Sequence, residues 1–259
     1  MKVNSYVSVG SWQEAYKLLK ASPKNKILGG GLWLKKGNAQ VDTLIDLSRL
    51  GLNKIEDKGS FVEVGSMVTQ RELETSPLIQ SIGGGVISEA VSQIMGPAFR
   101  NLATVGGSIY GKYGFSDLIT VLLGFEVELQ FYPNNKMSLE EYLAMPGFYD
   151  GILTHIRIQK KEVKAFFKKV CITALDYPIL NVCVTKGDKY RVVVGSRPLV
   201  ATRLAKVEEY LNNGGNDFEQ AANLAEEEIK VGDSMATKGE YRKQLTKVYV
   251  RRGLEEVNE

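Results

Sequence analysis

Apolar positions in the first fifty residues change between helical and strand-like spacing. Trp12, Tyr16 and the apolar residues around them recur every three or four positions, and Ser11 can cap the first turn. The amino terminus is therefore expected to lead directly into a helix. Apolar runs at Lys26–Leu28 and Thr43–Leu47 predict short strands. Together these patterns predict a small α/β unit.

The middle of the chain has the same mixture on a larger scale. Phe61–Gly65 alternates between apolar and polar residues, which predicts a strand, and Glu126–Phe131 predicts another. Val86 to Met95 has helical spacing and ends at Gly96-Pro97, while Leu118–Leu123 is a second helix candidate. We expect a larger α+β region here.

The last hundred residues change from strands to helices. Phe166–Thr185 and Tyr190–Gly195 are predicted to pair through a hairpin turn at Lys186–Lys189. Three helices are then expected, at Leu204–Leu211, Asp217–Ile229 and Lys238–Leu254. The predicted class is α+β, with domains at residues 1–54, 55–158 and 159–259.

Composition narrows the class of protein without naming one. The chain has 259 residues and 44% hydrophobic content, enough for a sizeable core. A formal net charge of +3 is too small to favour nucleic acid as the main partner. Two cysteines and one histidine argue against a disulfide framework, an iron–sulfur cluster or a zinc site within the chain.

No targeting or membrane segment is expected from the sequence. The first residues lack the apolar core of a signal peptide, and the run Leu118–Phe125 is too short to span a bilayer. We therefore expect a cytoplasmic protein in a reducing compartment.

Two glycine-rich turns carry the main chemical signal. The first is Ile27-Leu28-Gly29-Gly30-Gly31-Leu32-Trp33-Leu34, and the second runs from Arg100 through Thr104, Gly106 and Gly107 to Ser108. Adjacent glycines let a backbone approach a ligand and direct N–H groups at it. Two such turns suit a ligand with a central diphosphate, such as a dinucleotide.

Neither turn fits a one-turn phosphate motif. A P-loop beginning at Gly106 would need Ser or Thr where Tyr113 stands, because that hydroxyl holds magnesium. A Rossmann fingerprint beginning at Gly29 would need glycine where Leu34 stands. A third triplet, Gly83–Gly85, is interpreted as a tight turn.

Several single residues allow both a structural and a functional interpretation. Asp117 either caps the following helix, as Ser116 also could, or accepts hydrogen bonds from ligand hydroxyls. His155 has no nucleophile motif beside it and is interpreted as a strand residue. One basic run indicates a solvated face or a contact of one member with a flavin or phosphate: Lys160, Lys161, Lys164, Lys168 and Lys169. A second run on the terminal helix indicates a subunit interface or surface: Arg242, Lys243, Lys247, Arg251 and Arg252.

Taken together, these segments resemble the FAD-binding subunit of molybdenum hydroxylases, the xanthine dehydrogenase and carbon monoxide dehydrogenase type. The resemblance covers nearly the whole chain. The matching stretches, in chain order, are the glycine turn at Gly29–Gly31, Val64–Thr69, Arg100–Gly107 followed by Ser116-Asp117, Phe167–Asp176, and Glu240–Arg252. The chain departs from the family at Ser108, where asparagine is usual, and at Tyr110–Phe115, where small residues are usual.

The resemblance implies a fold and a set of cofactor contacts. The fold would be a two-part FAD-binding region of the vanillyl-alcohol-oxidase type, followed by a C-terminal antiparallel sheet with helices. Ile27–Leu34 and Thr104–Ser108 would hold the pyrophosphate and flank the flavin. Asp117 would contact ribose or ribityl hydroxyls, and Leu153 and Lys168 would also contact the flavin.

The same resemblance implies a role in electron transfer. Substrate would be hydroxylated at a molybdopterin centre on a large subunit, and electrons would pass through 2Fe-2S clusters on a small subunit to FAD and then to NAD⁺ or another acceptor. No catalytic residue or metal ligand is expected on this chain. The alternatives are a stand-alone FAD-dependent oxidoreductase and a non-enzymatic nucleotide-binding protein.

Overall fold

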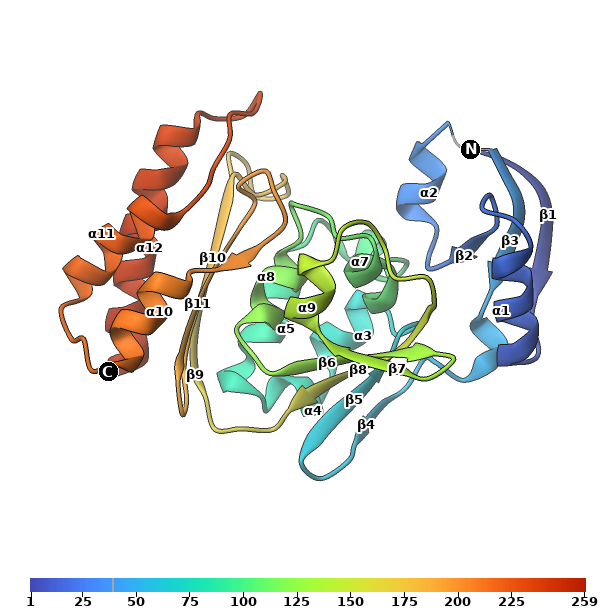
Figure 1. The fold of residues 1–259 in the computed structure, drawn as a ribbon, viewed down its shortest axis with the longest axis horizontal. Coiled ribbons are helices and arrows are strands. Elements are labelled where there is room, and N and C mark those ends of the chain that lie inside the picture. The colour runs from blue at the N-terminus through green and yellow to red at the C-terminus, as the bar shows by residue number, and fades with distance from the viewer. Residues whose placement is uncertain (39) are drawn as a thin grey trace. The chain divides into compact units, whose positions relative to one another are not determined.

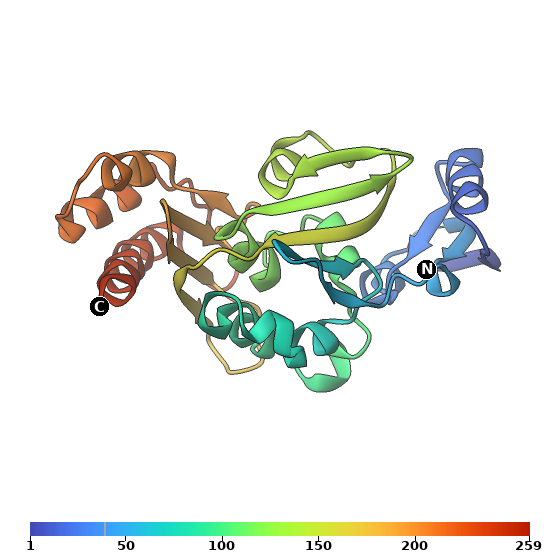
Figure 2. The same ribbon diagram turned by 90° about the horizontal axis from the view of Figure 1, so that it is seen from below.

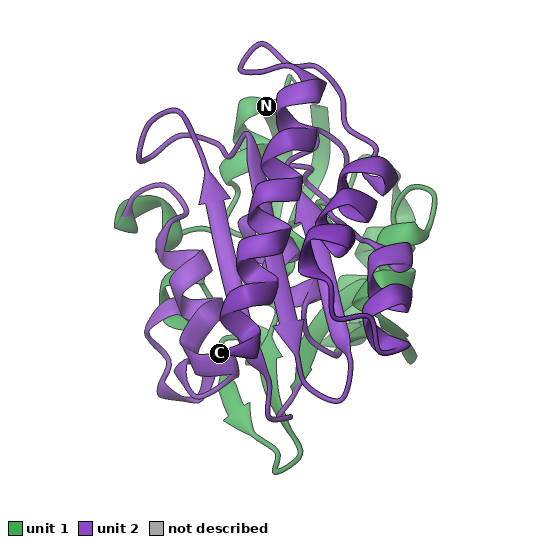
Figure 3. Ribbon diagram, turned by 90° about the vertical axis from the view of Figure 1, so that its left-hand side faces the viewer, with its two compact units in different colours: residues 1–73, 97–111, 127–158 green, residues 74–96, 112–126, 159–259 purple. Residues whose placement is uncertain are grey.

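The computed structural model describes residues 1–38 and 40–259, which divide into two compact units with interleaved sequence. Unit 1 comprises residues 1–73, 97–111 and 127–158, and unit 2 comprises residues 74–96, 112–126 and 159–259 (Figure 3). The chain therefore passes between the units several times, and each unit is built from segments far apart in sequence.

Unit 1 contains two sheets. The first has the order β1-β3-β2, with all strands parallel: β1 Lys2–Ser8, β3 Gln40–Asp46 and β2 Lys26–Leu28 (Figure 1). Helix α1, Trp12–Ala21, covers it and is capped by the Ser11 side chain, as predicted. The strand β1 was not expected, since residues 1–8 were predicted to lead directly into the helix. Only its pairing with β3 makes this mostly exposed segment a strand.

The second sheet of unit 1 has five strands in the order β4-β5-β8-β6-β7. Buried side chains alternate with partly exposed ones along β6, as expected for a sheet with one apolar face. The strands are β4 Ile55–Asp57, β5 Phe61–Gly65, β6 Val127–Tyr132, β7 Asn135–Ser138 and β8 Ile152–Gln159. Short helical segments complete this part: α2 Leu32–Lys36, η1 Ser48–Leu50, α3 Gln70–Thr75, α6 Pro97–Arg100, α7 Val105–Tyr110 and α9 Leu139–Ala144.

Unit 2 has a four-stranded antiparallel sheet between two layers of helices. Its order is β12-β11-β10-β9, from Thr202–Arg203, Tyr190–Gly195, Leu180–Lys186 and Lys164–Val170. Figures 1 and 2 show α12 lying along these strands. The helical elements are α4 Pro77–Gln80, η2 Gly83–Gly85, α5 Val86–Ser92, α8 Asp117–Leu123, α10 Ala205–Asn212, α11 Phe218–Glu228 and α12 Gly239–Asn258.

The central strand β10 explains why this sheet is covered on both faces. Leu180, Val182 and Val184 belong to the apolar core shared with α10, α11 and α12. The alternate residues face α8, where Asn181 bonds Asp117 and the Thr185 hydroxyl donates to the Gly124 carbonyl at 2.7 Å. A strand buried on both faces typically has a nearly continuous apolar sequence.

Three predictions for this region need correction. Phe166–Thr185 is not one strand but β9 and β10 separated by residues 171–179, whose large apolar residues Ile172 and Leu175 are exposed. The helix predicted over Val86–Met95 ends at Ser92. Arg242 is neither surface nor interface within this chain. It is 3% exposed, and its guanidinium donates to the carbonyls of Ile179 and Gly232.

Candidate functional site

The first glycine turn presents unpaired backbone donors. It follows β2 and precedes α2, and Gly30 and Gly31 have φ angles of +76° and +74°, a left-handed conformation that favours glycine. Among the described residues, the N–H groups of Gly30, Gly31 and Leu32 donate no hydrogen bond. Three successive unpaired N–H groups are suited to bind an anion such as a phosphate.

The second glycine turn lies directly against the first. A Cβ atom on Gly107 would stand 2.9 Å from the Gly29 carbonyl oxygen, and one on Gly29 would stand 3.0 Å from the Thr104 hydroxyl. A Cβ atom on Gly30 would overlap the Leu102 carbonyl oxygen. The glycines at these positions are required because the two backbones approach more closely than side chains would permit.

Four consecutive N–H groups of the second turn are already engaged. The N–H groups of Val105, Gly106, Gly107 and Ser108 donate to Val68 O, Ser66 O, Thr104 Oγ1 and Thr104 O, at 2.8 to 3.1 Å. The turns are therefore not equivalent. The first carries the unpaired N–H groups, and the second fixes the first in place.

Gln70 is a residue of this region that the sequence analysis missed. Its side chain is 4% exposed, its backbone N–H donates to Ala103 O at 2.7 Å, and its Nε2 donates to the Ser108 hydroxyl at 2.9 Å. Its Oε1 is buried without a hydrogen-bond partner among the described residues. The signal lay in the departure at Ser108, because a short hydroxyl there leaves room for a longer partner.

In unit 2, Asp117 belongs to a closed buried network. Its carboxylate accepts a 2.8 Å hydrogen bond from Asn181 Nδ2 and lies 3.6 Å from Lys169 Nζ. Thr120 donates to Asn181 Oδ1 at 2.9 Å, and Lys169 Nζ donates to Gln93 O at 2.8 Å. Ser116, not Asp117, caps helix α8 by accepting from the Ile119 N–H. Asp117 is 3% exposed, and both of its oxygens have protein partners.

Burial controls the protonation of Asp117. Loss of hydration raises its pKa to about 6, although the charge of Lys169 and the hydrogen bond from Asn181 both lower it. A carboxylate that titrates near neutral pH inside a covered site can change charge in response to its surroundings.

The remaining predicted contacts occupy different environments. Leu153 is a buried residue of β8, and Lys168 is exposed on β9, with its ammonium 6.0 Å from the ring centre of Tyr249. Lys169, the next residue, faces the opposite side of the sheet and carries the buried charge. His155 is partly buried on β8, and burial lowers its pKa.

Comparisons with known proteins agree with this architecture. Residues 1–161 match the family described as the FAD binding domain in molybdopterin dehydrogenase, and residues 165–257 match the CO dehydrogenase flavoprotein C-terminal domain. The solved structure of the carbon monoxide dehydrogenase from Hydrogenophaga pseudoflava superposes with a TM-score of 0.89 at 22% identity. That match covers 98% of this chain and 96% of the other, and it shows that the fold is shared.

Curated relatives include proteins named as a medium subunit or a medium chain, and the protein YgfM. The chain is 27% identical to the nicotine 6-hydroxylase medium subunit of Paenarthrobacter nicotinovorans, over 97% of this chain and 96% of that protein. It is 28% identical to YgfM of Escherichia coli, over 68% of this chain and 66% of YgfM. It is also 37% identical to the carbon monoxide dehydrogenase medium chain of H. pseudoflava, over 49% of this chain and 44% of that protein.

The chain belongs to the family of FAD-binding domains in molybdopterin dehydrogenases. The family resemblance and the α+β fold class predicted from the sequence are thereby confirmed. The residues present also fit the cofactor, since the first turn offers unpaired N–H groups to a diphosphate and its Gly30 and Gly31 carry no side chains. Within the described residues, no helix is long and apolar enough to cross a membrane.

The close approach of the turns gives a first prediction. Gly30→Ala should abolish or severely weaken FAD binding, because the methyl group would collide with Leu102 and push the turns apart. Gly59 has a φ of +79°, but a Cβ atom there would meet no other atom within 4 Å, so Gly59→Ala reproduces the backbone strain without the collision. Flavin content after reconstitution measures both. Equal flavin content in the two variants would refute the role of the contact.

A second prediction concerns the link between Gln70 and Ser108. Gln70→Leu and Ser108→Ala should each weaken FAD binding by about tenfold, since one buried hydrogen bond positions the second turn. The double variant should be little worse than either single variant, because both remove the same bond. Fluorescence titration with FAD gives the dissociation constants, and fully additive effects would contradict the proposed link.

A third prediction follows from the raised pKa of Asp117. The folded state holds this proton more tightly than the unfolded state, so its stabilising effect is complete below about pH 4 and is lost as the pH rises through about 6. The loss amounts to at most about 3 kcal/mol. Asp117→Asn should remove this pH-dependent component. In urea unfolding, the free energy of unfolding of the variant relative to that of the wild type should therefore rise between about pH 4.5 and 7. Parallel pH curves would exclude this titration.

Proposed function

We propose that this chain is the FAD-binding electron-transfer subunit of a cytoplasmic molybdenum-dependent hydroxylase or dehydrogenase of the xanthine dehydrogenase type. The main support for this proposal is the first glycine turn, which has three unpaired N–H groups and packs against the second turn, in a chain of this family. Bound FAD would supply the redox chemistry, accepting electrons from a partner subunit and passing them to an acceptor.

The residues of this chain would bind and orient the cofactor. Ile27–Leu34 would hold the diphosphate through the backbone of Gly30, Gly31 and Leu32, and Thr104–Ser108 would support that backbone from behind. Because the N–H groups of Val105–Ser108 are engaged, the contribution of these four residues would be positional.

Asp117, Leu153 and Lys168 complete the proposed contacts. Asp117 would accept hydrogen bonds from ribose or ribityl hydroxyls. Buried Leu153 would supply apolar surface, and exposed Lys168 a positive charge. Asn181 and Lys169 would then set the position and charge of Asp117.

The partners follow from the same proposal. A large molybdopterin-binding subunit would hydroxylate the substrate, and a small 2Fe-2S subunit would deliver electrons to this chain. The final acceptor would be NAD⁺ or another oxidant. Relatives named as medium subunits or medium chains support a multisubunit assembly.

The decisive experiment starts with the purified full-length chain. After reconstitution it should show a flavin absorption spectrum with close to one FAD per chain, and it should co-purify with a large and a small subunit when these are co-expressed. Reduction of the bound flavin by NADH would then identify the acceptor class. A colourless chain that cannot be reconstituted would refute the proposal, whereas a flavoprotein that turns over substrate alone would favour a stand-alone oxidoreductase.

A further inference from the structure

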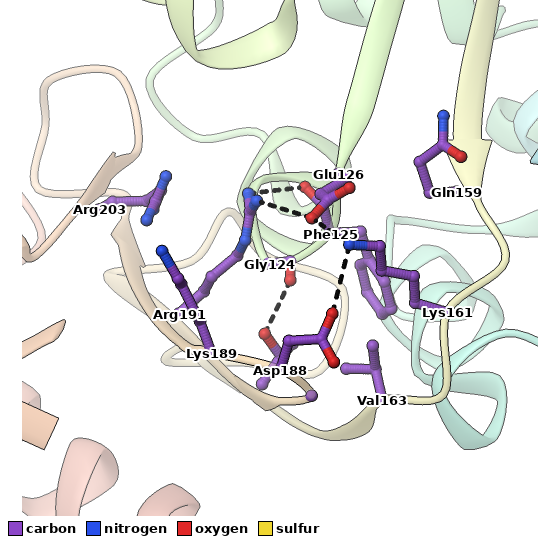
Figure 4. A pocket seen from close by; sticks show the side chains of 12 residues that line it. Gly124, Phe125, Glu126, Gln159, Lys161, Val163, Asp188, Lys189, Arg191 and Arg203 are labelled. Carbon is purple, nitrogen blue, oxygen red and sulfur yellow. Dashed lines mark hydrogen bonds and ion pairs between the residues drawn. The ribbon is translucent and has the colours of Figure 1, made fainter. Parts of the chain in front are cut away.

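Unit 2 has a pocket that contains none of the residues proposed to contact FAD. Its volume is about 360 Å³, within the range of small-molecule sites. It lies between the carboxyl end of α8, the segment after β8 and the hairpin that joins β10 to β11 (Figure 4). Along β10 the pocket reaches Thr185, four residues beyond Asn181, which corresponds to about 13 Å of strand.

Four basic side chains line this pocket against two acidic ones. The basic residues are Lys161, Lys189, Arg191 and Arg203, and the acidic residues are Glu126 and Asp188. Glu208, which lies outside the lining, also binds Arg203. When the negative charge of Glu208 is added to those of Glu126 and Asp188, the net charge at the pocket is still +1. A positive pocket of this size favours an anionic ligand.

The cations differ in how strongly the protein already holds them. Lys161 Nζ lies 2.8 Å from Glu126 and 3.4 Å from Asp188. Arg191 donates to Phe125 O at 3.1 Å and lies 3.8 Å from the Glu126 carboxylate, a long ion pair. The ammonium of Lys189 has no ion pair or hydrogen bond among those found in the described chain, and the residue is exposed.

Three of these cations gather on one side of the pocket. In the view of Figure 4, the charged ends of Lys189, Arg191 and Arg203 lie on the side away from Gln159. The Arg191 and Arg203 side chains are each only 24% exposed, so two guanidinium groups are held in place beside an exposed lysine. Fixed guanidinium groups with an added ammonium match the oxygens of a phosphate group.

We propose that this pocket binds the phosphate group of a small phosphorylated molecule of about mononucleotide size. Lys189, Arg191 and Arg203 contact the phosphate, and the space towards Gln159 and Val163 receives the rest of the molecule. Glu126 holds Lys161 and Arg191 in position when no ligand is bound. The pocket shares no residue with the proposed FAD contacts, so it would serve a second ligand.

The test uses the full chain saturated with FAD, so that an adenine nucleotide cannot enter the flavin site. Isothermal titration with ADP should show one binding event that weakens as salt is added, and adenosine should show none. Lys189→Gln should weaken ADP binding about tenfold, since one charge-assisted contact is lost. Lys189→Glu should abolish it. Lys164→Gln, an exposed lysine of β9 outside the pocket lining, serves as the matched control and should bind ADP like the wild type.

Each other outcome overturns the proposal. Absence of ADP binding, equal binding of adenosine, or equal affinity in Lys189→Glu and the wild type would each show that the pocket does not bind phosphate. If the chain fails to bind FAD, the proposed function fails. The pocket can still be tested, because the Lys189 variants change this pocket and none of the proposed FAD contacts, and so show whether ADP binds there.

Discussion

The close contact between two glycine turns is the constraint on which the rest of unit 1 depends. Gly107 approaches the Gly29 carbonyl and Gly30 approaches the Leu102 carbonyl at separations that exclude a side chain. The turns come from segments about 75 residues apart in sequence, so the contact exists only when the two sheets and the connecting segments of unit 1 are in place. A binding surface for a diphosphate is thus a property of the folded unit and not of either loop.

The contact also divides the work between the turns. One turn keeps its N–H groups unpaired, which is costly unless solvent or a ligand satisfies them. In the other, the N–H groups of Val105–Ser108 donate to Ser66, Val68 and its own Thr104, and so it becomes a rigid support. A flexible support would let the first turn move away from an anion, and the entropy of fixing it would then oppose binding. Gln70 belongs to this support, which explains how a chain with serine at position 108 still fixes its second turn.

Unit 2 buries charged side chains. Asp117 and Lys169 are each 3% exposed at the side chain, and an isolated charge in that environment would be strongly unfavourable. Asn181, Thr120 and the Gln93 carbonyl complete the network, so each polar group has a partner. Arg242 is handled in the same way by backbone carbonyls. The Asp117 network and the Arg242 contacts both connect helices to the sheet. From the sequence, Asp117 could have been a helix cap, and Lys169 and Arg242 could have been part of a solvated surface.

Most of the helices and strands, and the family, could be predicted from the amino-acid sequence. The apolar periodicity located α1, β5, α8, α11 and α12 to within a few residues, because each buries a face with a regular spacing. The motif order identified the family, since glycines and their neighbours must recur where backbones meet a diphosphate. The strand β1 could not be predicted, because its residues are largely exposed and only its pairing with β3 defines it. The division into domains at residues 54 and 158 and the individual flavin contacts stay predictions.

The tertiary structure sets which members of each motif are exposed or keep unpaired donors and which are buried against the protein. Lys168 is exposed and its neighbour Lys169 is buried, because successive residues of a strand point to opposite faces. Val105 and Gly106 of the second turn donate to Val68 and Ser66, two contacts that no local pattern could reveal. The pocket lined by Lys189, Arg191 and Arg203 also joins segments that are distant in sequence. Charge, burial and unpaired donors are properties of proximity in space, and a sequence taken alone specifies only proximity along the chain.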